Sequence, residues 1–205
     1  MLEQEIRTQA EAAKEASYTL AGLQADVRNA ALCAMADALM AHRDEILHAN
    51  AVDVEEAEKA GMRLSYLDRL RLDDGRITSM ADGLRLTAAL PDPLGREDYS
   101  VRRPNGLEIR RVRVPLGVVG MIYEARPNVT SDAIGLCLKS GNAVLLRGGS
   151  DALRSNRSIA DILSRAAYDA GIPTGAIQLL AMKDRTAVDV MTHLTGLRDV
   201  VIPRG

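Results

Sequence analysis

The sequence predicts an α/β fold in which a helical N-terminal segment and a β-hairpin lead into an open parallel sheet of Rossmann type. Three observations predict this fold. Residues 1 to about 90 are rich in Ala, Leu, Met, Glu and Arg, which favour helices. Two extended runs then flank Pro104-Asn105-Gly106, a turn signal. From Pro115 onward, short apolar runs alternate with helical stretches, as in βαβ crossovers between parallel strands.

The first segment, residues 1–98, is expected to hold several helices that pack on the sheet domain. One helix is predicted over 26–48, where Asp26 suits the N-cap and one face carries Leu32, Met35, Leu39 and Ile46. Gly61 and the pair Asp73-Asp74 are natural breaks, which leaves further helical stretches over 51–60, 64–71 and 74–89. The two prolines within 90–95 cannot continue a helix and predict a loop.

The second segment, residues 99–114, reads as a β-hairpin with extended runs over 100–103 and 107–114. Its Arg-Arg-Val-Arg tract, residues 110–113, is compatible with a phosphate-binding patch. The alternative interpretation is a solvated hairpin face or an oligomer-forming arm. We favour the second interpretation because the period-two alternation of a strand puts these arginines on different faces.

The third segment, residues 115–205, is expected to be a dinucleotide-binding α/β domain. Its apolar runs predict strands over 118–122, 143–146, 177–180 and 199–202. Helices are predicted between them over 130–140, 155–170 and about 184–195, and Gly141-Asn142 ends the first of these.

Composition excludes several classes of function. The chain has 205 residues, of which 47% are apolar, so it can bury a substantial core. The net charge of -2 and the absence of Trp and Phe argue against a nucleic-acid partner. No apolar run reaches the roughly 18 residues that a membrane span needs, and the N-terminus lacks a signal-peptide core, so we expect a cytoplasmic protein. Cys33 and Cys137 fit no metal-ligand spacing, so no metal is expected.

The first candidate site is the loop 123–129 after the first predicted strand. It places a carboxylate (Glu124), a guanidinium (Arg126) and an amide (Asn128) in one turn. Arg126 suits bidentate binding of a carboxylate or phosphate, and Asn128 can donate to a developing oxyanion. An ion pair between Arg126 and Glu124 that only shapes the loop is an equally good interpretation.

The second candidate site follows the next strand, at Arg147, Gly148, Gly149 and Ser150. Paired glycines let the backbone approach a ligand, and an arginine at this strand end can accommodate the 2′-phosphate of NADP. The alternative is a glycine-rich surface turn. A third, weaker signal is Pro203-Arg204-Gly205, where a glycine after a strand suits a phosphate-binding turn. Neither a G-x-G-x-x-G fingerprint nor a P-loop is present, and neither cysteine has the setting of a nucleophile.

The segment VRVPLGVVGMIYEARPNVTSDAIGLCLKSGNAVLLRGGSDALRSNRSI, with LPDPLG upstream and DVVIPRG downstream, resembles the gamma-glutamyl phosphate reductases of the aldehyde dehydrogenase superfamily. The resemblance covers nearly the whole chain. It implies an aldehyde dehydrogenase-like fold and the NADPH-dependent reduction of L-glutamyl 5-phosphate to L-glutamate 5-semialdehyde, the second step of proline biosynthesis.

The resemblance further implies a cysteine thioester whose cysteine lies beyond residue 205, so the fragment alone is expected to be inactive. Arg147, Gly148, Gly149, Ser150, Pro203, Arg204 and Gly205 would then bind NADPH, Glu124 and Arg126 the substrate, and Asn128 the oxyanion. A homo-oligomer is expected. Two other hypotheses stay open: a non-catalytic dinucleotide-binding or interaction module, and a different acyl-phosphate or acyl-CoA reductase of the superfamily.

Overall fold

A computed structural model describes residues 2–184 and 186–204. Its main sheet has four parallel strands in the order β5-β4-β3-β6. The strands are β3 (Val118–Tyr123), β4 (Ala143–Arg147), β5 (Ile177–Leu179) and β6 (Val200–Arg204). The chain crosses between them through α6 (Pro127–Lys139), α7 (Leu153–Asp169) and α8 (Thr186–His193). The predicted open parallel sheet is therefore confirmed, and the strand order reverses beside β3.

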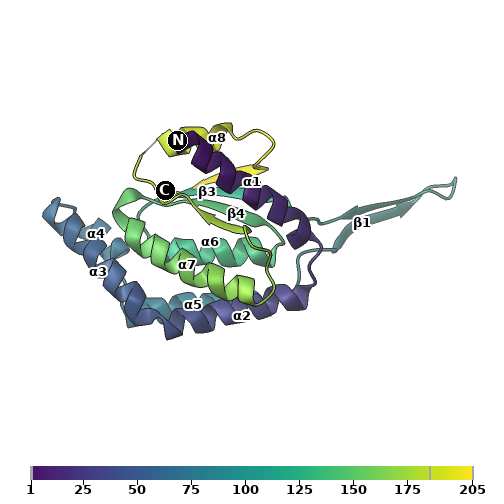
Figure 1. The fold of residues 1–205 in the computed structure, drawn as a ribbon. Helices are drawn as coiled ribbons and strands as arrows, with labels where there is room; N and C mark the ends of the chain where they lie inside the picture. Colours follow the sequence, from purple (N-terminus) through teal and green to yellow (C-terminus); the bar gives the residue numbers. More distant parts are fainter. Residues whose placement is uncertain (1, 185, 205) are drawn as a thin grey trace.

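The helices form layers on both faces of this sheet (Figure 1). On one face lie α1 (Leu2–Ala21) and α8; on the other lie α6 and α7. Behind α6 and α7 run α2 (Ala25–Ala41) and α5 (Asp74–Ala89). One hydrophobic core joins the layers, with Ile6 of α1, Leu145 of β4 and Leu32 of α2 all fully buried. The strand β4 is buried along its whole length, which explains the apolar run over its first four residues, 143–146.

The helix predicted over 26–48 is wrong in its extent. Helix α2 ends at Ala41, and α3 (Arg43–Lys59) begins after His42, which is shared as the C-cap of one helix and the N-cap of the other. No glycine or proline marks this bend, so the local sequence carries no signal for it. Asp26 lies in the first turn of α2 and is not its N-cap, which is Gln24.

The helix predicted over 74–89 is confirmed at both ends. The side chain of Asp73 accepts a hydrogen bond of 2.7 Å from the backbone N–H of Arg76, which fixes the N-terminus of α5. The short helix α4 (Leu64–Leu70) precedes it. Helix α5 packs on α6, and Arg69 of α4 pairs with Glu124 just after β3, which brings the N-terminal segment to the predicted site.

A buried polar network holds α3, α4 and α7 together beneath the site. The amide of Asn50 donates to the carbonyl of Leu70 (2.9 Å) and to Ser155 Oγ (3.0 Å), and its oxygen accepts from the N–H of Leu72 (2.7 Å). Asp53 Oδ2 accepts from both the N–H and the hydroxyl of Ser155, at 2.8 and 2.7 Å. The carboxylate thereby caps the start of α7.

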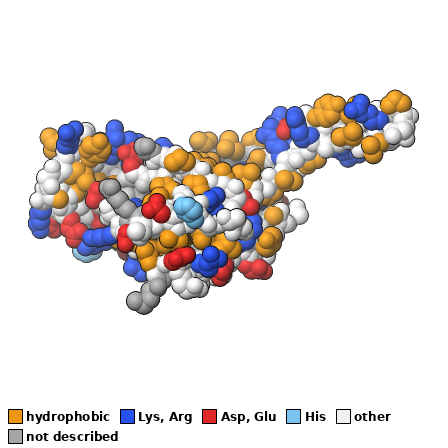
Figure 2. All heavy atoms as spheres, turned by 90° about the horizontal axis from the view of Figure 1, so that it is seen from above, with side chains coloured by type: hydrophobic (Ala, Val, Ile, Leu, Met, Phe, Trp, Pro, Cys, Tyr) orange, Lys and Arg blue, Asp and Glu red, His pale blue; other side chains and the backbone are white. Residues whose placement is uncertain are grey.

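The hairpin projects away from the body of the molecule (Figure 1), with β1 (Glu97–Arg102) paired antiparallel to β2 (Glu108–Val112). Figure 2 shows hydrophobic and basic side chains interspersed along it. Arg110 contacts Glu108 (2.9 Å), while Arg113 contacts Asp98 (2.9 Å). These arginines are thus paired with carboxylates of the hairpin itself, and the tract does not form a single basic face.

Candidate functional site

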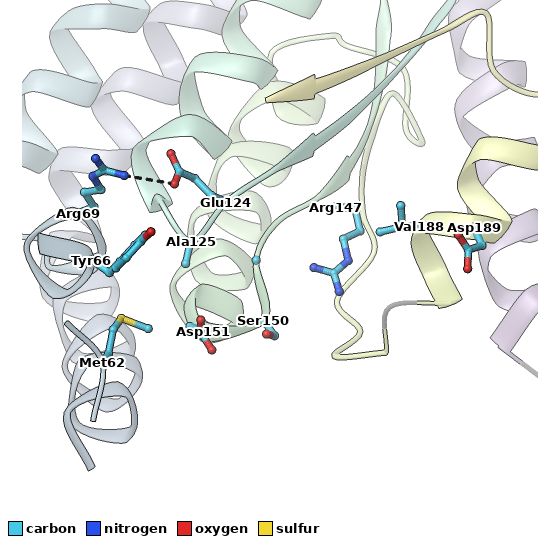
Figure 3. Close-up of a pocket in the computed structure, with 11 residues that line it drawn as sticks. Met62, Tyr66, Arg69, Glu124, Ala125, Arg147, Ser150, Asp151, Val188 and Asp189 are labelled. Atoms are coloured by element: carbon cyan, nitrogen blue, oxygen red, sulfur yellow. Dashed lines mark ion pairs between the residues drawn. The ribbon is translucent and has the colours of Figure 1, made fainter. Parts of the chain in front are cut away.

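A hollow of about 520 Å³ lies at the carboxyl ends of β3 and β4 (Figure 3). In an open α/β sheet this edge is where ligands bind. The loop after β3, the loop after β4, helix α4 and helix α8 each supply part of the wall. The lining residues are Met62, Tyr66, Arg69, Glu124, Ala125, Arg147, Gly149, Ser150, Asp151, Val188 and Asp189. The two strand-end loops that the sequence singled out therefore meet in one place.

Arg147 ends β4 with its side chain largely buried, and Figure 3 shows it lying between Ser150 and Val188. Its guanidinium donates to the carbonyl of Gly148 and, at 3.4 Å, to the carbonyls of Lys183 and Asp184. These bonds to neutral carbonyls hold the cation at the wall of the hollow.

The two glycines after Arg147 are needed by the protein's own packing. A Cβ on Gly148 would lie 2.2 Å from Asn156 Nδ2, and one on Gly149 would lie 2.7 Å from the backbone nitrogen of Ala125. The strand-end loops therefore contact each other through bare backbone. The sequence argument, that these glycines make room for a ligand, overlooked this packing requirement.

Glu124 contacts two guanidiniums. Its Oε1 lies 2.6 Å from Arg126 Nε, and its Oε2 lies 3.5 Å from Arg69 Nη1. The ion pair of Glu124 with Arg126 that the sequence left open is thus present. Arg69 comes from α4, more than fifty residues earlier in the chain, and Figure 3 shows it reaching Glu124 across the wall of the hollow.

Asn128 and Arg126 lie in a second hollow of about 310 Å³, beside the first. Arg69 lines both hollows. Asn128 is exposed at the start of α6, and its amide lies 3.5 Å from Asp132 Oδ2.

The third predicted site, Pro203-Arg204-Gly205, was expected to form a turn after a strand, and the structure differs. Pro203 and Arg204 are within β6, where they pair with Ile122 and Tyr123 of β3, so they do not form a turn after the strand. Proline is accommodated because β6 is an edge strand of the sheet. Arg204 is exposed and lines a third hollow beside α6, and Gly205 lies outside the described residues.

The cysteines lie away from these hollows. Cys137 is buried inside α6, and burial raises the pKa of its thiol to about 12, so it stays protonated and unreactive near neutral pH. Cys33 is exposed in the middle of α2. Within residues 2–184 and 186–204 no group of three His, Cys, Asp or Glu side chains is arranged to hold a metal ion. In the same residues, no helix is both long and apolar enough to span a bilayer.

Sequence reasoning missed the part of the site that α4 and the turn before it provide, namely Tyr66 and Arg69 of the helix and Met62 of the turn. The stretch 64–71 carried only a helical signal. Tyr66 and Arg69 are one turn apart, and the guanidinium carbon of Arg69 lies 5.6 Å from the centre of the Tyr66 ring. No local pattern indicates that this helix reaches the sheet edge.

A parallel sheet whose strand-end loops enclose a hollow where the strand order reverses is the place at which open α/β folds bind ligands. Residues 2–202 match the model of the aldehyde dehydrogenase family, so the chain belongs to this family. Aldehyde dehydrogenases are dinucleotide-dependent.

Within the family the chain is most informatively compared with gamma-glutamyl phosphate reductases. It is 55% identical over 201 residues to that of Caldanaerobacter subterraneus, which covers 98% of this chain and 49% of the relative. It is 53% identical over 204 residues to that of Syntrophomonas wolfei, covering 100% and 49%. The chain spans about half the length of these curated relatives.

Solved structures show the same similarity to gamma-glutamyl phosphate reductases. The gamma-glutamyl phosphate reductase of Thermotoga maritima superposes with a TM-score of 0.95 at 42% identity, over 98% of this chain and 49% of that one. The Saccharomyces cerevisiae protein gives a TM-score of 0.88 at 32% identity, over 99% and 51%. A probable aldehyde dehydrogenase of Listeria monocytogenes, 20% identical with a TM-score of 0.75, shares the fold. The aldehyde dehydrogenase-like fold expected from the sequence is confirmed.

Proposed function

We propose that the protein to which this chain belongs reduces L-glutamyl 5-phosphate to L-glutamate 5-semialdehyde with release of phosphate, as a step of proline biosynthesis. The observation that carries the proposal is the sequence identity of 50–55% to proteins named gamma-glutamyl phosphate reductase over nearly the whole chain. The nucleophilic cysteine is assigned to a part of the protein beyond residue 205. Neither Cys33 nor Cys137 lies at the strand-end hollows, which supports this assignment.

We further propose NADPH as the cofactor, held by Arg147, Gly148, Gly149 and Ser150, with Pro203, Arg204 and Gly205 contributing from the next strand end. When bound, NADPH supplies the hydride. The fit rests on the place of Arg147, a cation at the end of β4 that lines the hollow, where an open α/β sheet binds the ribose of a dinucleotide and an arginine can accommodate a 2′-phosphate. Ser150 lines the same hollow, and its hydroxyl can donate to the same group.

The substrate is assigned to Glu124, Arg126 and Asn128. Arg126 faces the acyl phosphate, and Glu124 holds the Arg126 guanidinium in place through the 2.6 Å ion pair. The amide of Asn128, exposed at the start of α6, donates to the oxyanion that develops on the acyl group. These roles agree with the position of the three residues around adjoining hollows at one sheet edge.

The test is the reverse reaction of the full-length protein with L-glutamate 5-semialdehyde, NADP and phosphate, followed by NADPH formation. We expect turnover that depends on all three reactants. A protein that binds NADP but turns over none of them would instead be a non-catalytic dinucleotide-binding module. Faster turnover of another acyl phosphate or an acyl-CoA would identify a different reductase of the superfamily.

We also propose that the hairpin, residues 99–114, is the arm through which the protein forms a homo-oligomer. Val101 pairs with Ile109, so they share one face of the hairpin, whereas Ser100 and Arg110 point to the other. Ile109 is 40% exposed although it is apolar. Ile109→Glu should lower the oligomeric mass of the full-length protein in light scattering, and Ser100→Glu should not. An unchanged mass for Ile109→Glu would exclude this face as the contact.

A further inference from the structure

The second hollow carries charges of both signs, of which the proposed reaction uses only Arg126. It lies between α4, the start of α5 and the start of α6. Its lining includes four arginines and two aspartates: Arg69, Arg71, Arg76, Arg126, Asp68 and Asp132. Arg69 also lines the first hollow, so a ligand in the second hollow can reach the first.

The excess positive charge of this hollow lies at Arg69 and Arg126. Both guanidiniums share a single carboxylate, that of Glu124, at 3.5 and 2.6 Å. By contrast, Arg71 has Glu58 at 2.8 Å and Arg76 has Asp68 at 2.9 Å. Two cations that share one anion leave one unit of positive charge at the boundary between the hollows, suited to an anionic group of a ligand.

The negative charge of the hollow lies at Asp132, one helical turn after Asn128 on α6. Its side chain is exposed, and the Asn128 amide donates to its Oδ2 at 3.5 Å. Within the described part of the chain, no cation lies within the 4.0 Å of an ion pair with it. Partial burial raises the pKa of Asp132, while the more distant charge of Arg204 lowers it. The carboxylate is therefore accessible to a ligand and lies more than 4.0 Å from the described cations of the hollow.

We propose that this hollow binds the α-amino-acid end of the substrate, with Asp132 holding the α-ammonium group and the Arg69–Arg126 pair facing its anionic groups. The inference rests on the proposed function, because the substrate L-glutamyl 5-phosphate carries one ammonium, one carboxylate and one phosphate. A carboxylate lacking a close cation faces the one cation of the ligand. Two arginines that share one carboxylate face its anions. The hollow is thereby a specificity site for amino acids over simple dicarboxylic acids.

The test compares substrates with and without the α-amino group on the full-length protein. In the reverse direction, Asp132→Asn should raise KM for L-glutamate 5-semialdehyde about tenfold to a hundredfold, the range for losing a charge-assisted hydrogen bond. It should leave kcat within a few-fold. For 5-oxopentanoate, which has the same chain without the amino group, KM should not change. The control Asp82→Asn removes an exposed carboxylate of α5 that pairs with Arg85 and lines neither of the first two hollows.

A second measurement does not depend on turnover. Calorimetric titration should show that the wild-type protein binds L-glutamate more tightly than glutarate and that Asp132→Asn abolishes this preference. If this holds while no turnover is found, the subsite stands and the proposed reaction fails. Equal KM increases for both semialdehydes would mean that Asp132 acts through Arg204 or the fold. Equal KM increases would overturn the inference. An unchanged preference of Asp132→Asn for L-glutamate over glutarate would overturn it as well.

Discussion

Replacing Asp53 by Ala should lower the free energy of unfolding more than replacing any exposed residue near the site. Asp53 is 2% exposed, and its Oδ2 accepts two hydrogen bonds from Ser155, of 2.8 and 2.7 Å. Ser155 is fully buried at the start of α7, so alanine would leave its N–H and hydroxyl without these acceptors and away from water. Charge-assisted hydrogen bonds contribute about 1.5–3 kcal/mol each, so the free energy of unfolding should fall by about 3–5 kcal/mol.

A loss of this size is a large part of a typical stability of about 5–15 kcal/mol. For a protein of 150–250 residues it corresponds to a decrease in Tm of about 6–20 °C, and the decrease is smaller for a longer chain. Asp53→Asn keeps one acceptor oxygen and should lose less. The matched control is Glu56→Ala, which removes an exposed carboxylate 2.6 Å from Arg154 and should change Tm little because exposed ion pairs contribute little.

Thermal unfolding of the full-length protein measures the global effect, and hydrogen exchange locates it. The amide of Ser155 should exchange faster in Asp53→Ala, because its N–H donates to the missing carboxylate. Amides of the hairpin should be unaffected. A Tm within 2 °C of wild type, or unchanged protection of the Ser155 amide, would refute the capping role of Asp53.

Four further outcomes are expected. Burial raises the pKa of the Asp132 carboxyl in the folded protein. The ionised carboxylate therefore destabilises the fold above the folded-state pKa, and this effect is absent below the unfolded value of about 3.9. Asp132→Asn should raise Tm at pH 7, and the increase should shrink as the pH falls towards 4. Gly149→Ala, whose Cβ would meet backbone at 2.7 Å, should destabilise by about 1–3 kcal/mol, whereas Gly83→Ala, inside α5 with nothing within 4 Å, should stabilise by about 0.5–1 kcal/mol; equal Tm changes would contradict the packing argument. Arg147→Ala should lower the preference for NADPH over NADH about tenfold to a hundredfold in equilibrium titrations, and an unchanged ratio would remove Arg147 from that role. Residues 1–205 alone should show no reductase turnover and should self-associate through the edge strand β6, where Ile202 is 42% exposed; a monodisperse chain that Ile202→Lys leaves unaltered would disprove this.

The sequence by itself determined the order and type of the elements. The Asp73 cap fixed the start of α5 because it acts over three residues, and Pro104-Asn105-Gly106 located the hairpin turn because turn chemistry is equally local. Apolar runs located the four parallel strands, since buried strands require continuous apolar sequence. These signals also placed the loops after β3 and β4 at a common edge, because parallel strands share a carboxyl end.

Only the tertiary structure decided which distant residues complete the site. Arg69 reaches Glu124 because the Asn50 network ties the end of α4 to α7, and that network spans more than one hundred residues between Asn50 and Ser155. The bend at His42 follows from packing, since α2 lies on α5 and α7 while α3 lies on α7 and α4. Contacts between elements depend on the summed shape and burial of many side chains, so no residue carries them in its own sequence neighbourhood.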